Sequence, residues 1–214
     1  MELNECLVLG TGLMIIFTQL TRRKVGISFV KSVFAMLCLT ISGVFGAFLM
    51  FYIENGEIGG ISYFGSVLFA PILLFVFSKI LRLDFLKYLN ISAPAECIML
   101  AVMKTSCYAT GCCGGSELFQ SFSPIPLQLV ECINALIIAI VLTYLYLKLD
   151  FEYIYAWYFV IYGCTRFILN FFRLDVSSFL LGLSAGHFWA LLSIIIGSCF
   201  IIFYKRNLNK IDER

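Results

Sequence analysis

The sequence predicts an all-α integral membrane bundle of about seven transmembrane helices. The 214 residues are 61% hydrophobic and only 13% charged, with a mean hydropathy of +0.97, against about 45–50% apolar and 25% charged residues in soluble domains. Apolar stretches long enough to cross a hydrocarbon core of about 30 Å recur along the whole chain. Because only short polar breaks separate them, we expect residues 1–214 to form a single transmembrane domain.

Charged residues, glycines or prolines bound each expected helix. The predicted spans are 6–20, 29–53, 61–82, 91–108, 126–147, 154–172 and 183–204. The first span starts within a few residues of Met1, with no basic segment before it and no small-residue cleavage pattern after it. We therefore expect a membrane helix there and not a cleaved signal peptide.

The charges between the spans predict the orientation of the bundle. Basic residues follow the first, third, fifth and seventh spans, and acidic residues lie in the opposite set of breaks. The basic set is Arg22, Arg23, Lys24, Lys79, Arg82, Lys87, Lys148, Lys205, Arg206, Lys210 and Arg214. The positive-inside rule then places the N-terminus outside and the C-terminus in the cytoplasm, which requires an odd number of spans.

Two functional classes are disfavoured by the overall pattern. The net charge is only +2 and no exposed basic run is interleaved with aromatic residues, so no nucleic-acid partner is expected. No fixed-period repeat and no inverted pair of Gly- or Pro-broken spans is visible, which argues against a secondary transporter.

Ionisable residues inside the predicted spans indicate where function lies, because a charge at mid-bilayer costs about 2.5–3.5 kcal/mol on insertion scales. On the sixth span Tyr162, Arg166, Asn170 and Arg173 follow helical spacing and lie on one face. Arg166 lies about two turns deeper than Arg173, too deep to reach the interface easily. We expect Arg166 to face the interior of the bundle.

Two other spans supply polar groups at the same depth. Gln128 and Glu131 share a face of the fifth span, and Glu96 and Lys104 share a face of the fourth. Glu131 is a natural counter-ion for a buried guanidinium. Except for Glu96, these groups lie toward the outer leaflet and could line a cavity for an anionic lipid headgroup. A guanidinium can bind a phosphate through two parallel hydrogen bonds, and a lysine acts as a point charge. The alternative is an internal set of salt bridges that serves packing alone.

Glycines, cysteines and a single histidine give weaker signals. Glycine-rich segments with Gly59, Gly60, Ser62 and Gly65, and with Gly111 and Gly115, lie at the outer side, where exposed amides can bind anionic oxygens. Most of the nine cysteines are expected to behave as small hydrophobes. Cys107, Cys112 and Cys113 cluster without zinc-type spacing to His187, so we expect no metal and no cofactor. We expect His187 to hydrogen-bond at the interface, with a role as general base as the alternative.

The motifs in their order resemble those of the prolipoprotein diacylglyceryl transferase family over residues 57–200. The matching segments are 59–65, 104–115, 126–131 and 162–173. The third and fourth are the most specific, because they nearly reproduce the family patterns Pro-x-Gln-Leu-Tyr-Glu and Tyr-Gly-x-x-Arg-Phe-x-x-Glu-Phe-x-Arg.

The resemblance implies a membrane enzyme that transfers a diacylglyceryl group from phosphatidylglycerol to the lipobox cysteine of a lipoprotein precursor, by way of the precursor's signal peptide. It implies a multi-pass protein of the cytoplasmic (inner) cell membrane and no soluble cofactor. By position, Arg166 would hold the phosphate with Lys104 beside it, and Tyr162, Gln128 and Glu131 would shape the cavity. Arg173, Asn170, His187 and the glycine-rich segments would complete substrate binding.

The chain departs from the family pattern at several positions. Phe64 stands where the family has a histidine, Lys104 where it has an arginine, Cys107 where it has an asparagine and Asn170 where it has a glutamate. Phe64 can neither accept a proton nor donate a hydrogen bond. The alternative function is therefore a phospholipid-binding or partner-binding membrane protein that kept the fold and lost the reaction. A small transporter that uses Arg166, Glu131 and Lys104 as a substrate site is a third possibility.

Overall fold

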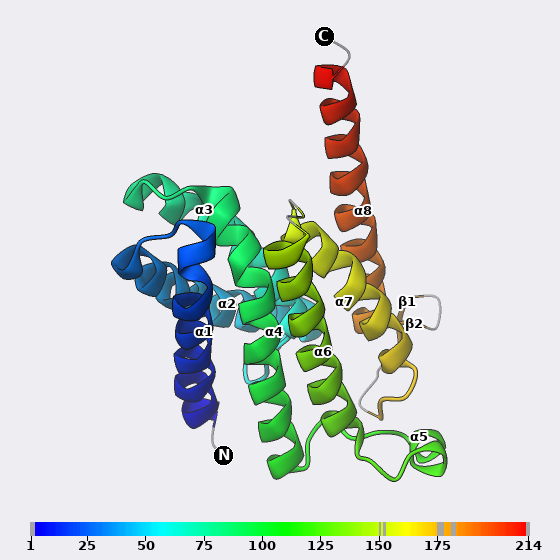
Figure 1. Ribbon diagram of the computed structural model, residues 1–214. Coiled ribbons are helices and arrows are strands. Elements are labelled where there is room, and N and C mark those ends of the chain that lie inside the picture. The colour runs from blue at the N-terminus through cyan, green and yellow to red at the C-terminus, as the bar shows by residue number, and fades with distance from the viewer. Residues whose placement is uncertain (1–2, 150, 152, 175–177, 181–182, 213–214) are drawn as a thin grey trace.

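The computed structural model describes residues 3–149, 151, 153–174, 178–180 and 183–212, and the side chains of 178–180 and 205–212 are not described further. In this part of the chain eight helices and one small hairpin form a bundle (Figure 1). The helices are α1 (Leu3–Val25), α2 (Phe29–Asn55), α3 (Tyr63–Leu81), α4 (Phe85–Thr110), α5 (Glu117–Phe122), α6 (Leu127–Lys148), α7 (Ile154–Asn170) and α8 (Ala185–Asp212). The antiparallel hairpin pairs β1 (Ser178–Leu180) with β2 (Leu183–Ser184).

The predicted fold class, a helical membrane bundle, is confirmed. Within the described residues six helices, all but α5 and α7, are long and apolar enough to cross a membrane. The sixth predicted span, 154–172, is present as α7, whose 17 residues make it the shortest helix in that role. The start of α1 and the end of α8 lie at opposite ends of the bundle (Figure 1), as an odd number of crossings requires.

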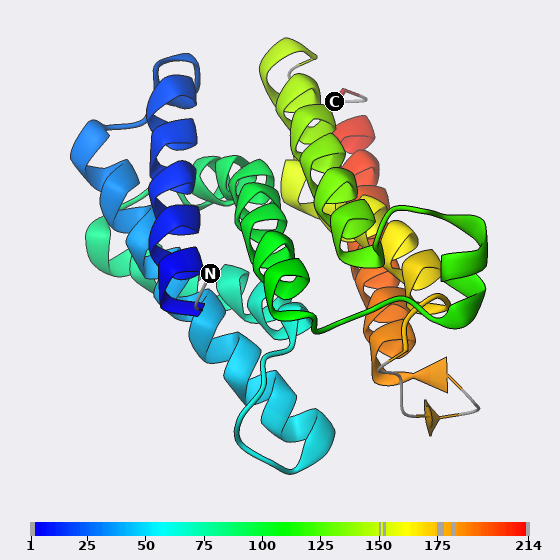
Figure 2. The same cartoon turned by 90° about the horizontal axis from the view of Figure 1, so that it is seen from below.

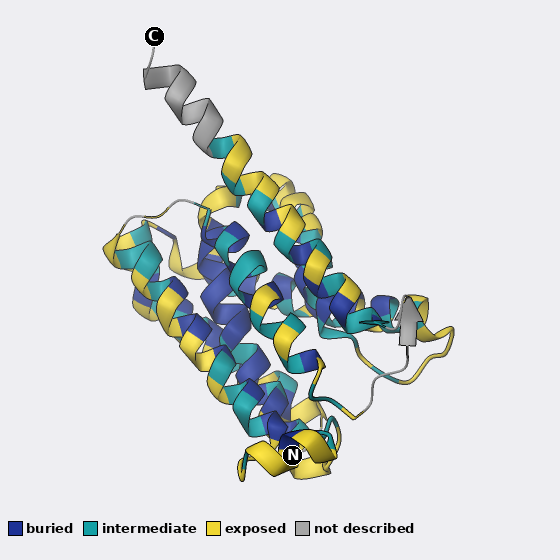
Figure 3. Cartoon of the chain, turned by 90° about the vertical axis from the view of Figure 1, so that its right-hand side faces the viewer, coloured by how far each residue is buried: buried dark blue, intermediate teal, exposed yellow. Residues whose placement is uncertain are grey.

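The centre of the bundle is α4, which lies between the α1–α3 group and the α6–α8 group (Figure 2). In the apolar 18-residue stretch of α4 that could cross a membrane, 67% of the residues are buried, the highest share among the candidate spans. Its middle is a run of small buried residues, Ser92 to Ala95, which lets neighbouring helices approach closely. Exposed residues lie on the outward faces of the helices (Figure 3), and many of them are large and apolar, such as Leu20 and Ile140. In a bilayer these side chains face lipid.

Two glycines set the crossing of α2 and α3. A Cβ atom on Gly46 would lie 2.5 Å from the carbonyl oxygen of Gly65, and a Cβ on Gly65 would lie 2.0 Å from that of Gly46. Both distances are too short for any side chain, so only glycine permits this backbone contact. Gly65, which the sequence placed among the ligand-binding residues, therefore has a packing role in the structure.

A short segment between α4 and α5 is attached to the chain just after α7. Gly115 and Arg173 form an isolated antiparallel bridge. The amide of Ser116 donates to the carbonyl of Phe172 at 2.8 Å, and the amide of Leu174 donates to that of Gly114 at 3.1 Å. Residues 111–116 and Arg173 are thereby held on one side of the bundle.

Candidate functional site

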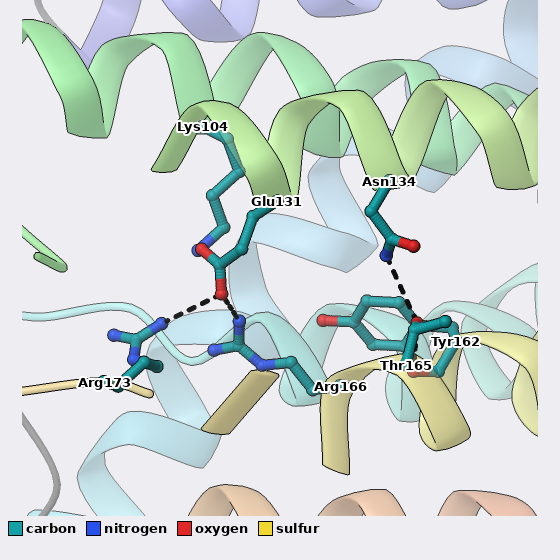
Figure 4. A network of polar contacts seen from close by, with 7 residues as sticks. All are labelled: Lys104, Glu131, Asn134, Tyr162, Thr165, Arg166 and Arg173. Carbon is teal, nitrogen blue, oxygen red and sulfur yellow. Dashed lines mark hydrogen bonds and ion pairs between the residues drawn. The ribbon is translucent and has the colours of Figure 1, made fainter. Parts of the chain in front are cut away.

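Four charged side chains meet between α4, α6 and α7, and we call Lys104, Glu131, Arg166 and Arg173 the ion cluster (Figure 4). The carboxylate of Glu131 on α6 pairs with Lys104 Nζ from α4 and with Arg166 Nη1 from α7. Arg173 Nη1, just beyond α7, lies 3.7 Å from Glu131 Oε1. The counter-ion that the sequence assigned to Arg166 is thus Glu131, and it also contacts the other two cations.

The ion cluster contains more basic than acidic side chains, and all of them are largely buried. Glu131 retains only 3% of its side-chain exposure, Lys104 9% and each arginine 13%. The ion cluster itself holds three basic groups and one carboxylate, so within the described residues that form it the formal charge is +2 in a largely buried place. The Nε atom of Arg166 is also buried and has no hydrogen-bond partner among the described residues. Buried charge without compensation is expensive, and the cluster is therefore suited to bind an anion.

A cavity of about 930 Å³ adjoins the ion cluster. Lys104, Arg166 and Arg173 line one part of it, together with Asn170. The wall that α1 and α2 contribute is mainly apolar, with Leu3, Leu7, Met14, Leu39, Val44, Ala47, Phe48 and Phe51. A cavity with a cationic region and an apolar wall matches an anionic molecule with hydrocarbon chains.

The structure brings some of the predicted binding residues to this cavity. Gly59, Gly60 and Ser62 line it with the residues above. Gly59 has φ +143°, which favours glycine, and a Cβ on Gly60 would lie 2.3 Å from the ring of Phe51. Ser62 Oγ donates to Glu54 Oε1 at 3.0 Å, and this bond ties the segment to the end of α2.

Other predicted residues support the site without lining the cavity. Gln128 Nε2 donates to the carbonyl of Cys112 at 2.7 Å and so positions the segment after α4. Gly111 ends α4 in the left-handed region, with φ +72°. Gly115 packs against Phe119, where a Cβ would lie 2.8 Å from the ring. These residues shape the loop and have no place in the lining of the cavity.

Tyr162 lies in the core behind the ion cluster. It is 3% exposed, and its ring packs against Tyr63 and Phe64 with centroid separations of 5.4 and 5.6 Å. Phe64, at the position of the family's histidine, lines the cavity as an apolar ring. A proton acceptor is therefore absent at that point of the wall.

His187 is buried at the start of α8 and does not line the cavity. The amide of Ser184 donates to His187 Nδ1 at 3.4 Å, and the amide of His187 donates back to Ser184 Oγ at 3.3 Å. The rings of Phe167 and Phe171 pack against the imidazole. This reciprocal pair has the pattern of a capping box, so a helix-capping role accounts for its contacts.

Two residues that no sequence motif indicated also contribute to this end of the cavity. Ser184 and Gly186 both line the cavity beside Asn170. A Cβ on Gly186 would lie 2.5 Å from Asn170 Nδ2, so glycine here makes room for the Asn170 amide. A glycine one residue before the only histidine was the available signal, but a helix start explains such a glycine equally well.

Glu96 belongs to a separate buried network. Tyr155 Oη donates to its carboxylate at 2.9 Å, and Ser92 Oγ donates to Oε1 at 3.3 Å. Tyr63 Oη donates to the Glu96 carbonyl at 3.1 Å. Although Glu96 shares a helix face with Lys104 as expected, its side chain pairs with hydroxyl groups and not with that lysine.

Three cysteines also line the cavity near the ion cluster: Cys107, Cys112 and Cys113. Their sulfur atoms all lie within 4.8 Å of one another. A hydrogen bond from Cys107, and then the positive charges of Lys104 and Arg173, lower the pKa of the Cys113 thiol, although burial opposes this shift. The sequence showed that these residues cluster but not that their sulfur atoms converge.

The fold and the cavity define a multi-pass helical membrane protein with a cationic pocket between its helices. Residues 6–203 match the family model of prolipoprotein diacylglyceryl transferase. The chain belongs to this family. It is also similar to the phosphatidylglycerol–prolipoprotein diacylglyceryl transferase of Clostridium tetani (strain Massachusetts / E88), with 26% identity over 184 residues that cover 73% of this chain and 74% of that relative.

Proposed function

We propose that this protein transfers the diacylglyceryl group of phosphatidylglycerol to the thiol of a lipobox cysteine in a lipoprotein precursor, at the outer side of the cytoplasmic membrane. One observation carries the proposal: three cations share a single carboxylate beside a cavity whose wall from α1 and α2 is mainly apolar. The family and the name of the Clostridium relative support the choice of reaction.

The chemistry of phosphatidylglycerol suits this cavity. Its phosphodiester carries one negative charge, which the excess positive charge of the ion cluster would compensate. Arg166 offers a planar fork for two phosphate oxygens, and Lys104 adds a point charge from α4. The two acyl chains would lie along the apolar wall of α1 and α2, where they remove apolar surface from water.

The transfer replaces a carbon–oxygen bond by a carbon–sulfur bond. The acceptor thiol loses its proton to water at the outer surface, and its sulfur attacks the glyceryl carbon that carries the phosphate. The bond between that carbon and the phosphate oxygen breaks, and its electron pair goes to the leaving glycerol phosphate. The leaving group gains a second negative charge, which Arg166, Lys104 and Arg173 are placed to stabilise. One such preorganised donor is worth about 2.7–4 kcal/mol in other enzymes.

The test is transfer by the purified protein from phosphatidylglycerol vesicles to a lipobox peptide, followed as the mass increase of the peptide. Arg166→Ala should abolish transfer, and Arg166→Lys should retain less than the original protein because a point charge replaces the fork. Lys79→Ala is the matched control, because Lys79 is an exposed cation on α3 away from the cavity. Binding of phosphatidylglycerol without any peptide product would instead identify the protein as a non-catalytic lipid binder.

A further inference from the structure

Three cysteines lie beside the ion cluster, and the proposed lipid transfer gives them no role. Cys107 lies in the last turn of α4, and Cys112 and Cys113 follow its C-terminal cap. All three side chains contribute to the wall of the cavity. We propose that Cys107, Cys112 and Cys113 bind a thiophilic divalent cation such as Zn²⁺, with one coordination position open to the cavity for the acceptor thiol. The use of the open position by the acceptor thiol rests on the proposed function.

The sulfur positions are close to those that a metal site needs. Zinc–sulfur bonds of about 2.3 Å in tetrahedral geometry put the sulfur atoms about 3.8 Å apart. In this structure the three sulfur atoms lie within 4.8 Å of one another. Side-chain movements of about 1 Å or less would therefore bring them into coordination.

The backbone after α4 is held in the conformation that makes the sulfur atoms converge. Gly111 and Cys113 both have left-handed backbone angles, with φ +72° and +59°. For a cysteine this conformation costs about 1 kcal/mol or more. The hydrogen bond from Gln128 to the Cys112 carbonyl and the bridge between Gly115 and Arg173 hold the segment in place. Two independent attachments thus support a strained turn that presents thiols to a cavity.

The ligand type and the surrounding charge select the cation. Thiolates prefer soft ions and zinc over Mg²⁺ or Ca²⁺, which take oxygen ligands. Three thiolates with one divalent cation leave a net charge of −1. Lys104 and Arg173 line the same cavity as the three cysteines, so their positive charges would compensate that charge. The ion cluster thereby stabilises a tris-thiolate site, although it would repel a bare cation.

A site with three protein ligands leaves one position of a tetrahedron for a water or a substrate. The three cysteines line the same cavity as Arg173, so a fourth ligand would reach the ion from this cavity. An acceptor thiol that binds there would give up its proton to water at the mouth of the cavity, because thiols coordinate as thiolates. The bound sulfur would then lie near the phosphate held by Arg166, ready for the displacement described above. The site would thus activate the acceptor in a cavity whose wall carries Phe64.

The first experiment measures metal binding without any activity assay. The full chain, purified in detergent and reduced, is titrated with Co²⁺, and the thiolate-to-cobalt charge-transfer absorption is followed. We expect one Co²⁺ per chain, displaced by Zn²⁺. Cys113→Ser and Cys107→Ser should each weaken binding by more than about 100-fold. Each change removes a direct ligand, whereas the loss of a residue that only supports a ligand already costs about 10- to 100-fold. Cys164→Ser and Cys199→Ser, which change exposed cysteines elsewhere, should bind as the original protein does.

Three results of this titration would overturn the metal site. They are the absence of stoichiometric Co²⁺ binding, binding that survives Cys113→Ser, and a disulfide among the three cysteines that persists under reduction. Thermal denaturation of each variant shows that it is folded, and Cys112→Ser provides a further ligand variant if either of the other two fails to fold.

A second experiment separates the acceptor role from the proposed function. A lipobox peptide should shift the Co²⁺ spectrum, and the same peptide with serine in place of cysteine should not. Equal spectra with both peptides, or undiminished transfer by Cys113→Ser, would overturn the acceptor role and leave the transferase function standing. Normal Co²⁺ binding in a protein that transfers no lipid with or without Zn²⁺ would instead overturn the proposed function and leave the metal site standing.

Discussion

Glu131 on α6 pairs with basic side chains of α4 and α7 and with Arg173 just beyond α7, and it is almost fully buried. Glu131→Gln keeps the size of the side chain and removes its charge, so the ion cluster would keep its three basic groups and lose its carboxylate. Breaking a buried pair in this way costs about 3–5 kcal/mol. We expect a clear fall of the thermal denaturation midpoint in detergent. Glu117→Gln, an exposed change of the same kind on α5, should leave the midpoint within the error of measurement.

Added anion should distinguish charge from packing in the same variant. If the fall in stability comes from uncompensated positive charge, glycerol phosphate should restore more of the midpoint in Glu131→Gln than in the original protein, because an anion replaces the lost carboxylate. A midpoint that does not respond to the anion in either protein would contradict an anion site at the cluster.

Gly186 controls the position of Asn170 at the cavity wall. A methyl group there would meet the Asn170 amide, which must then rotate or shift. Since a displacement of about 1 Å near a reacting centre can reduce a rate by about 100-fold, we expect Gly186→Ala to slow lipid transfer by about 10- to 100-fold. Gly12→Ala is the control, because a Cβ at Gly12 would meet no atom within 4 Å. Equal transfer rates in both variants would show that Asn170 does not need its present position.

The α2–α3 crossing depends on the contact between Gly46 and Gly65. Gly65→Val would push the side chain into the backbone of α2, and such overpacking costs about 1–3 kcal/mol. We expect a lower thermal denaturation midpoint. Transfer should fall as well, because α2 and the segment before α3 carry much of the cavity wall. An unchanged midpoint would mean that the two helices can separate without loss.

The long helices could be predicted from hydropathy because each must bury about twenty apolar residues in lipid. The seven predicted spans correspond to α1, α2, α3, α4, α6, α7 and α8, with ends that differ by up to eight residues, at the end of α8. The six-residue helix α5 and the short hairpin escaped prediction, since their formation depends on Ser116 as a cap and on pairing of backbone groups. Local contacts of this kind leave no hydropathy pattern.

The charged part of the site was visible in the sequence for a related reason: a charge in an apolar span stands out. Lys104, Glu131, Arg166 and Arg173 were all selected in this way, and the structure brings them together. The convergence of the three cysteine sulfur atoms was not visible, because it depends on the left-handed turn at Cys113. Spacing along a helix predicts a shared face, whereas a loop between helices can place its side chains in many ways.

The orientation of the whole bundle stays a prediction, and it can be tested at its two ends. The start of α1 and the end of α8 lie at opposite ends (Figure 1), and the basic residues gather in alternate breaks of the sequence. The positive-inside rule then puts Glu57 and the segment 111–116 outside and Lys24 inside. A cysteine introduced at Glu57 should react with a membrane-impermeant maleimide in intact cells, and one at Lys24 should react only after permeabilisation. The labelling is done in a background without the exposed natural cysteines. Reaction of the cysteine at position 24 in intact cells would show that the bundle has the opposite orientation. The cavity beside the ion cluster would then open toward the cytoplasm, where an exported precursor could not reach it.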